Sequence, residues 1–197
     1  MKRIIFLIII TMFCAGCTSK NPIVTMEIKD YGTIKMELYP DYAPNTVANF
    51  VSLINEGFYD YNTFHRLMPN FVLQGGDPTG TGTGGPNYKI AGEFKLNGYN
   101  NNNLSHEEGI VSMARSKSYD SAGSQFFIVL NDSAKYSLDN SYAAFGKVIE
   151  GMDIIKKIEK EEVIEDTKSG KLKNNLTIIK TTVDTFGKNY KLKKITN

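Results

Sequence analysis

Apolar and polar residues alternate along residues 24–29 and 33–39, which is the pattern of half-buried β-strands. The intervening residues 30–32 (DYG) favour a turn, so we expect the two strands to form a hairpin. Apolar residues then recur at helical spacing between Pro44, which favours a first helical turn, and Gly57, which favours a helix end. This part of the chain therefore predicts a β-hairpin followed by a helix with one buried face.

Beyond this helix, short apolar runs are separated by polar loops. Further strands are predicted at 63–73, 110–114, 125–130, 143–149 and 176–183. A second helix is predicted at 151–161. Loops are expected at the glycine-rich segment 75–86, the polar segment 97–103 and the charged segment 165–175. Many short strands with two isolated helices predict a mainly β protein, a closed barrel capped at its ends, rather than a series of βαβ units.

The first residues of the chain follow a different pattern, that of an export signal. Lys2 and Arg3 precede an apolar run at 4–13. This run is shorter than the roughly 20 residues that span a bilayer, which favours a cleaved signal peptide over a permanent transmembrane helix. The next four residues, 14–17 (CAGC), resemble a bacterial lipobox, in which the last cysteine is lipidated and becomes the mature N-terminus.

The lipobox-like segment predicts lipidation of Cys17, with a signal peptide at 1–16 and a tether at 17–23. A lipid anchor would hold the protein to a cell membrane on the extracytoplasmic side, at its periplasmic or extracellular face. The alternative is an ordinary secretory signal with an incidental cysteine. Both cysteines of the chain lie in this segment, so the rest of the chain cannot form disulfides and depends on its core alone.

Composition and charge narrow the class of protein further. The 197 residues fit one domain, and 41% hydrophobic with 22% charged residues argues against disorder. The chain has 23 Lys and Arg against 21 Asp and Glu, and signal cleavage removes Lys2 and Arg3 without any acid, so the mature chain is neutral. No nucleic acid partner is therefore expected. The lysine-rich C-terminal tail, 186–197, is expected to be solvated, although anionic lipid headgroups could attract it.

Three kinds of site chemistry find little support in the residues. The glycine-rich segment lacks the Gly-Lys-Ser/Thr and the following helix of a P-loop, so we expect tight turns there, with a nucleotide-binding lipoprotein as an alternative. His65 and His106 are the only histidines, too few for a structural zinc site, and no metal is expected. Neither histidine has a recognisable triad setting, and His65 is expected to be a hydrogen-bonded structural residue.

One ordered set of motifs resembles a known family. Phe64-His65-Arg66 is followed by PNFVLQGGD (69–77), GTGG (82–85), GIVSMAR (109–115), GSQFFI (123–128), LD (138–139) and FGKV (145–148). In this order the motifs are similar to those of the cyclophilin family of peptidyl-prolyl isomerases, over residues 24–185. The resemblance implies a closed eight-stranded antiparallel β-barrel capped by two α-helices. It also implies proline-containing polypeptides as substrates and no cofactor, and we expect a monomer.

The resemblance also assigns candidate site residues. The catalytic candidates are Arg66, Phe71, Gln74, Phe127 and Tyr142. The substrate-binding candidates are Val72, Gly82, Ala114, Arg115, Ser116, Gln125 and Leu138. Arg66 would donate a hydrogen bond toward the proline nitrogen of the twisted amide, Gln74 would orient Arg66, and the apolar residues would accept the proline ring. A guanidinium suits this task better than an ammonium, and the chain has only three arginines against 20 lysines.

Four positions depart from other members of the family. Val72 stands where many relatives have Met, and Arg115 stands where eukaryotic relatives often have Asn. Tyr142 stands where eukaryotic relatives carry His, and Ser137 replaces the Trp that contacts cyclosporin, so weak inhibition by cyclosporin is expected. The function implied is isomerisation of X–Pro bonds, assisting the folding of exported proteins. The main alternative is a module on the same barrel that binds proline-containing segments, or acts as a chaperone, with little turnover. The presence of Arg66, Phe71 and Gln74 favours the isomerase.

Overall fold

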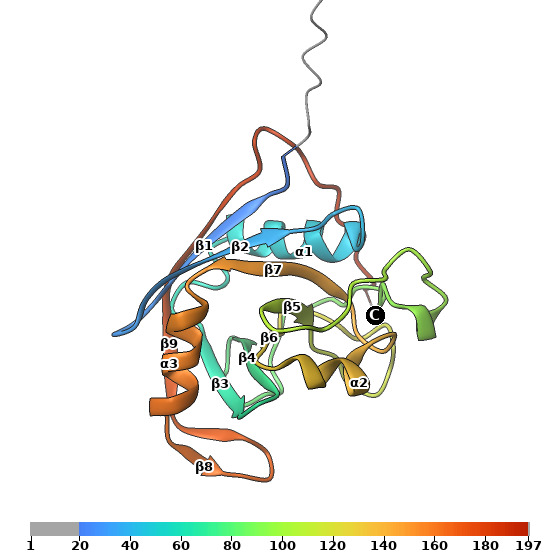
Figure 1. The fold of residues 1–197 in the computed structure, drawn as a ribbon. Coiled ribbons are helices and arrows are strands. Elements are labelled where there is room, and N and C mark those ends of the chain that lie inside the picture. Colours follow the sequence, from blue (N-terminus) through green and yellow to red (C-terminus); the bar gives the residue numbers. More distant parts are fainter. Residues whose placement is uncertain (1–19, 197) are drawn as a thin grey trace, which may run out of the picture.

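The computed structural model describes residues 20–196, so Cys17, the predicted signal peptide and the first part of the tether lie outside the described residues. Eight strands form an antiparallel barrel in the order β1, β2, β7, β5, β6, β4, β3 and β9, and pairing of β9 with β1 closes it (Figure 1). The strands are β1 (Ile23–Ile28), β2 (Gly32–Leu38), β3 (Thr63–Met68), β4 (Val72–Asp77), β5 (Ile110–Met113), β6 (Phe126–Val129), β7 (Ala144–Glu150) and β9 (Lys171–Asp184). The predicted fold class is confirmed.

The interior of the barrel is filled with aromatic and aliphatic side chains. Phe50, on α1 (Pro44–Asn55), contacts the rings of Tyr59, Phe126 and Phe145, with centroid distances of 4.9, 5.3 and 5.0 Å. All four rings are fully buried. The buried face of α1 therefore packs into the barrel, as the helical spacing of its apolar residues predicted.

The N-terminus of α1 is capped by a residue that is distant in sequence. The N-cap residue, Ala43, has no side-chain acceptor. The carboxylate of the buried Glu93 accepts hydrogen bonds from the N–H of Asn45 at 2.9 Å, the N–H of Thr46 at 2.7 Å and the hydroxyl of Thr46 at 2.6 Å. A carboxylate here satisfies free N–H groups and interacts favourably with the helix dipole. Glu93 thereby ties the long loop between β4 and β5 to α1.

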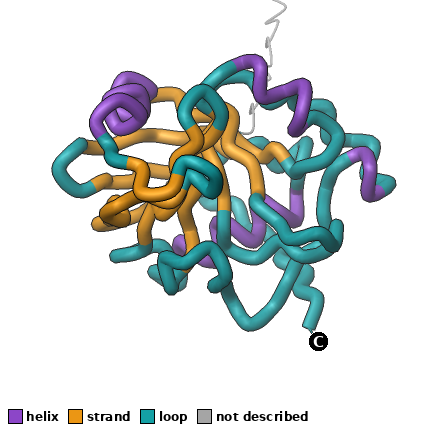
Figure 2. Tube along the Cα trace, turned by 90° about the horizontal axis from the view of Figure 1, so that it is seen from below, coloured by secondary structure: helices purple, strands orange, loops and turns teal. Residues whose placement is uncertain are grey.

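Two further α-helices pack around the barrel. The helix predicted at 151–161 is observed as α3 (Met152–Glu161), which buries Ile155 and Ile158 in the main core. A short helix, α2 (Lys135–Leu138), was not predicted, because four residues are too few to show a helical period. Two 3-10 turns, η1 (Lys95–Asn97) and η2 (Asp132–Ala134), complete the helical elements. Within residues 20–196, no helix is long and apolar enough to cross a membrane. Figure 2 shows the strands gathered together and long loops extending beyond them.

The charged segment 165–175 is not the loop that the sequence predicted. The strand β8 (Ile164–Asp166) pairs with the start of β9 and forms a hairpin that extends from the barrel (Figure 1). Leu172 and Leu176 are buried, while the lysine and asparagine residues between them are exposed. A strand with one solvated face carries polar residues on that face, which is why this segment had the composition of a loop.

The C-terminal tail keeps Lys191, Lys193 and Lys194 exposed, as expected of a solvated tail, but its backbone is paired with other parts of the molecule. The backbone N–H of Lys89 donates to the carbonyl oxygen of Ile195 at 3.0 Å, and the N–H of Ile195 donates back at 2.7 Å. The side chain of Asn45 donates to the carbonyl oxygen of Lys193 at 3.0 Å and accepts from its N–H at 2.7 Å. Residues at the very end of the described chain are therefore paired with α1 and with the loop that follows β4.

We expect deletion of residues 189–197 to lower the free energy of unfolding by about 1–3 kcal/mol. The deletion removes this backbone pairing and the contacts of Tyr190 and Leu192 with the main core. Urea unfolding of the full and shortened chains, followed by circular dichroism, measures the difference. Substitution of the exposed Lys191 by Ser serves as the control and should change stability little. Equal stability of the full and shortened chains would contradict the expectation.

Candidate active site

Arg66 lies on β3 and contacts the tip of the β8–β9 hairpin. Its Nε donates to the carbonyl oxygen of Ser169 at 2.7 Å, and its Nη1 donates to Oε1 of Gln74 at 3.0 Å. Its other N–H groups have no partner among the described residues. Burial lowers the pKa of Arg66, but a guanidinium stays protonated at any physiological pH. The site therefore contains a half-buried, oriented cation with unused hydrogen-bond donors.

A chain of hydrogen bonds leads from Arg66 to the glycine-rich loop. Nε2 of Gln74 donates to Oε1 of Gln125 at 3.0 Å. Nε2 of Gln125 donates in turn to the carbonyl oxygens of Gly82 at 3.1 Å and Gly84 at 2.9 Å. Because the amide of Gln74 accepts on one side and donates on the other, its orientation is fixed. The chain thus brings together candidate residues from β3, β4, the residue before β6 and the glycine-rich loop.

An apolar cluster, separate from the main core, lies beside this polar chain. Six candidate residues belong to it: Phe71, Val72, Ala114, Phe127, Leu138 and Tyr142, which we call the apolar patch. Phe127 is the direct cross-strand partner of Gln74. The ring of Tyr142 packs edge-on against Phe127, with centroids 5.7 Å apart and planes at 83°. The apolar patch therefore adjoins the chain of hydrogen bonds that begins at Arg66. Within the patch, Phe71, Ala114 and Tyr142 are partly exposed.

Two cavities meet at Gln74 and Gly82, which line both of them. A cavity of about 430 Å³ is also lined by the candidate residues Ala114, Arg115, Ser116 and Gln125. A cavity of about 460 Å³ is also lined by His65, Arg66, Ser169 and Lys171. Together with the apolar patch, these cavities account for all twelve candidate residues. The structure therefore brings every residue assigned by resemblance to one region of the surface.

The glycine-rich loop wraps around the carboxylate of Asp77. Oδ2 of Asp77 accepts from the N–H of Gly82 at 2.5 Å and of Gly84 at 3.0 Å, and Oδ1 accepts from the N–H and the hydroxyl of Thr79 at 2.7 and 2.8 Å. A Cβ on Gly84 would collide with Oδ1 of Asp77, and Gly82 has a φ of 89°, so both positions require glycine. The N–H groups that a phosphate would need are already bonded to Asp77, which argues against the nucleotide-binding alternative.

His106 lies in a hydrogen-bonded chain that the sequence did not reveal. Its Nδ1 is 2.8 Å from Oδ1 of Asp139, and its Nε2 is 3.0 Å from Oγ of Ser112, as in a Ser-His-Asp triad. No local motif marks these three residues, because they are brought together only by the fold. Ser112 is fully buried, so its hydroxyl cannot reach a substrate. His106 stacks on Phe127 at 6.1 Å, and the chain thereby supports the apolar patch instead of supplying a nucleophile.

His65 is not the hydrogen-bonded residue that the sequence suggested. Its side chain is buried, and neither ring nitrogen has a hydrogen-bond partner among the described residues. Burial lowers the pKa of His65, with the charge of Asp77 acting in the opposite direction, so the ring is neutral at pH 7.

In the part of the chain that the structure describes, no group of three His, Cys, Asp or Glu residues could hold a metal ion.

We expect the protein to lose stability as the pH falls below about 6.5, the usual pKa of histidine. Burial lowers the pKa of both His65 and His106 in the folded state. The unfolded chain therefore takes up protons first, and stability falls until the pH reaches the lowered folded-state values. Urea unfolding at about pH 8 and about pH 5.5 measures the effect. The variant His65→Gln should weaken this dependence, and equal stability of the wild-type protein at both pH values would contradict it.

Comparisons with known proteins agree with this site. The sequence model of the family described as "Cyclophilin type peptidyl-prolyl cis-trans isomerase/CLD" matches residues 23–183. Peptidyl-prolyl cis-trans isomerase B of Bacillus subtilis is 45% identical over 141 residues, which cover 72% of this chain and 93% of the relative. A peptidyl-prolyl cis-trans isomerase of Helicobacter pylori is 41% identical over 161 residues, covering 74% and 94%. The crystal structure of a Cryptosporidium parvum cyclophilin, determined with the dipeptide Ala-Pro, has a TM-score of 0.69 and 33% identity, covering 82% of this chain and 98% of that one.

The chain therefore belongs to the cyclophilin-type family of peptidyl-prolyl cis-trans isomerases. It is an enzyme that isomerises X–Pro peptide bonds, as the ordered motifs predicted.

Proposed function

We propose that Arg66 is the group that accelerates rotation about the X–Pro bond. Rotation meets a barrier of about 18–20 kcal/mol, because the nitrogen lone pair is conjugated with the carbonyl. In the twisted amide the proline nitrogen becomes pyramidal and more basic. A fixed cation that donates a hydrogen bond toward it stabilises this state more than the planar one. The observation that carries the proposal is the oriented guanidinium of Arg66, held by Ser169 and Gln74 with unused donors beside the apolar patch.

The other candidate residues support Arg66 in two ways. Gln74, held between Arg66 and Gln125, fixes the direction of the guanidinium. The apolar patch holds the proline ring in surroundings of low polarity, where the interaction of a cation with the twisted amide is stronger than in water. The cavity along Ala114 and Ser116 accepts the polypeptide next to the proline. Because all these residues come from one chain, a single copy supplies a complete site, which supports a monomeric enzyme.

The alternative of a binding module with little turnover is distinguished by measuring rate and affinity on the same peptide. A short proline-containing peptide is titrated with the protein, and its cis/trans exchange is followed by NMR. We expect saturable acceleration of exchange over the uncatalysed rate. Saturable binding without acceleration would contradict the assignment of Arg66 and favour the binding module.

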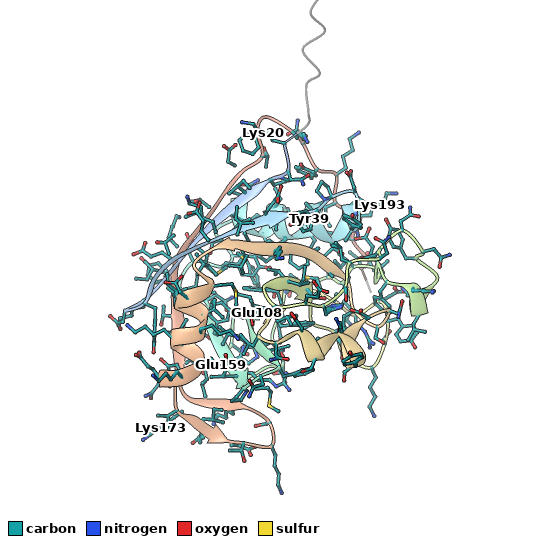
Figure 3. The ribbon with its side chains drawn as sticks, in the orientation of Figure 1. Lys20, Tyr39, Glu108, Glu159, Lys173 and Lys193 are labelled. Atoms are coloured by element: carbon teal, nitrogen blue, oxygen red, sulfur yellow. The ribbon has the colours of Figure 1, made fainter. Side chains whose placement is uncertain are left out.

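We further propose that the enzyme is anchored by a lipid on Cys17 and acts on exported polypeptides. The export signal and the lipobox-like segment support this proposal. β1 begins at Ile23, so the anchor would lie within about 20 Å of the barrel, at most 3.6 Å per residue. Lys20 lies at one end of the molecule, and Lys173, on the hairpin that contacts Arg66, lies at the other (Figures 1 and 3). An anchored enzyme would therefore carry its active site away from the membrane surface.

Expression of the full chain in a bacterium tests the anchor. We expect the wild-type protein in the membrane fraction, and the variant Cys17→Ser in the soluble extracytoplasmic fraction or as uncleaved precursor. The matched control is Cys14→Ser, which should remain in the membrane fraction. If Cys17→Ser is processed and distributed like the wild type, the segment is an ordinary secretory signal. Isomerase activity of the chain does not depend on this outcome.

A further inference from the structure

The guanidinium of Arg115 is enclosed by three aromatic rings. Its central carbon lies 5.2 Å from the ring centroid of Phe94, 5.0 Å from that of Tyr119 and 4.7 Å from that of Tyr142. Phe94 and Tyr119 also pack edge-on against each other, with centroids 5.4 Å apart. Cations are attracted to the faces of aromatic rings, and arginine is the cation most often found in such contacts. The side chain of Arg115 is therefore held in place by the protein itself.

The hydrogen bonds of Arg115 also stay within the protein. Its Nε donates to the carbonyl oxygen of Ser141 at 3.0 Å, and its Nη1 donates to the carbonyl oxygen of Ser116 at 2.9 Å. The resemblance assigned Arg115 to the segment that pairs with substrate. The bond to Ser141 joins this segment, after β5, to the segment after α2, and the bond to Ser116 stays within the segment after β5. A lysine could not make both bonds and lie flat against rings, because its ammonium is compact and lacks a planar fork of donors.

Tyr142 connects Arg115 to the substrate site. One side of its ring faces the guanidinium of Arg115, and the ring also packs edge-on against Phe127 in the apolar patch. Arg115 holds the backbone of Ser141, the residue immediately before Tyr142, through its Nε. Both the ring and the adjacent backbone of Tyr142 are thus fixed by the same guanidinium.

We propose that Arg115 is a positioning residue, which holds Tyr142 in the orientation that the substrate requires. This inference rests on the assignment of Tyr142 to the substrate site. Without Arg115, the ring of Tyr142 would sample several orientations and would have to be ordered when substrate binds. Ordering one side chain in this way weakens binding by about 3- to 10-fold, without changing the cation that acts on the twisted amide. The loss is therefore expected in KM, with kcat near the wild-type value.

A double-mutant cycle on the full chain tests this role. Arg115→Ala should raise KM about 3- to 10-fold at nearly constant kcat, and Arg115→Lys should rescue little of the loss. In the Tyr142→Ala background, Arg115→Ala should have no further effect on KM. The matched control is Lys117→Ala, an exposed cation in the same loop, with KM unchanged. Unfolding midpoints are measured for every variant, and if Arg115→Ala does not fold, the cycle is run with Arg115→Lys.

Three results would overturn the inference. If Arg115→Lys restores the wild-type KM, or if the effects of Arg115→Ala and Tyr142→Ala multiply, Arg115 acts on the substrate directly through its charge. If Tyr142→Ala alone leaves KM unchanged, the assignment of Tyr142 to the substrate site fails, and the inference fails with it. The proposed role of Arg66 is tested separately by kcat/KM of Arg66→Ala, so failure of one assignment is distinguishable from failure of the other.

Discussion

Replacement of Arg66 by Ala is expected to lower kcat/KM by about 10²- to 10³-fold, the usual effect of removing a donor that stabilises a transition state. The guanidinium is the only cation that both contacts Gln74 and lines the cavity beside the apolar patch, within the part of the chain that the structure describes. Its loss should reduce kcat more than binding, because the planar amide does not need the donor. Proline isomerisation of a short peptide, followed by NMR exchange over a range of peptide concentrations, separates the two parameters.

Two further variants sharpen this result. Arg66→Lys keeps the charge but cannot donate to Ser169 and Gln74 while also pointing donors at the substrate, so it should recover little activity. Lys171→Ala is the control, since Lys171 lines the same cavity but is paired with Glu165 at 2.5 Å on the exposed hairpin. Arg66→Ala with near wild-type kcat/KM and normal stability would falsify the mechanism. A loss of activity that follows a loss of folded protein is recognised by urea unfolding.

The parts of the fold that the sequence predicted are those with a clear local period. The hairpin at β1 and β2 and the helices α1 and α3 were predicted close to their observed bounds, because their apolar residues recur at spacings of two or of three to four. The apolar run 63–73 was predicted to form buried strands without a defined boundary, and a turn at Asn70, with a φ of 57°, divides it into β3 and β4. Asparagine tolerates this conformation, so the turn leaves only a weak signal in an apolar segment.

Contacts between distant segments could not be predicted from local patterns. The Glu93 cap of α1 and the bond between His106 and Asp139 join residues that are 47 and 33 positions apart in sequence. The candidate active site could be predicted from the sequence only because its motifs resemble those of a known family. The resemblance placed Arg115 among the substrate-binding candidates, and the structure adds that its guanidinium is enclosed by aromatic rings. Both arginines of the described chain thus depend on a planar guanidinium, Arg66 to present unused donors and Arg115 to stack between rings.

Replacement of Asp77 by Asn is expected to lower the free energy of unfolding by about 2–4 kcal/mol, the second large effect that the structure predicts. The buried carboxylate of Asp77 accepts four hydrogen bonds, and an amide group can accept at only one of its two positions. The other position would place its own N–H donors against the N–H groups of the glycine-rich loop. Because that loop holds Gln125, which holds Gln74, kcat/KM should also fall, by about tenfold.

The pH dependence of the stability difference between wild type and Asp77→Asn tests whether the ionised carboxylate of Asp77 causes it. Burial opposes ionisation of Asp77, but the hydrogen bonds from Thr79, Gly84 and Gly82 outweigh it and hold the pKa of Asp77 below its usual 3.8. A carboxylate with a lowered folded-state pKa contributes stability above its unfolded pKa and loses it as the pH falls through the folded value. Urea unfolding should therefore show that the free energies of unfolding of wild type and Asp77→Asn converge below pH 3.8 and differ fully at neutral pH.

The control Asp120→Asn removes an exposed carboxylate that accepts two hydrogen bonds, and it should lower the free energy of unfolding by less than about 1 kcal/mol. Equal losses from the two substitutions, or a difference that persists at low pH, would mean that the ionised carboxylate of Asp77 does not organise the loop.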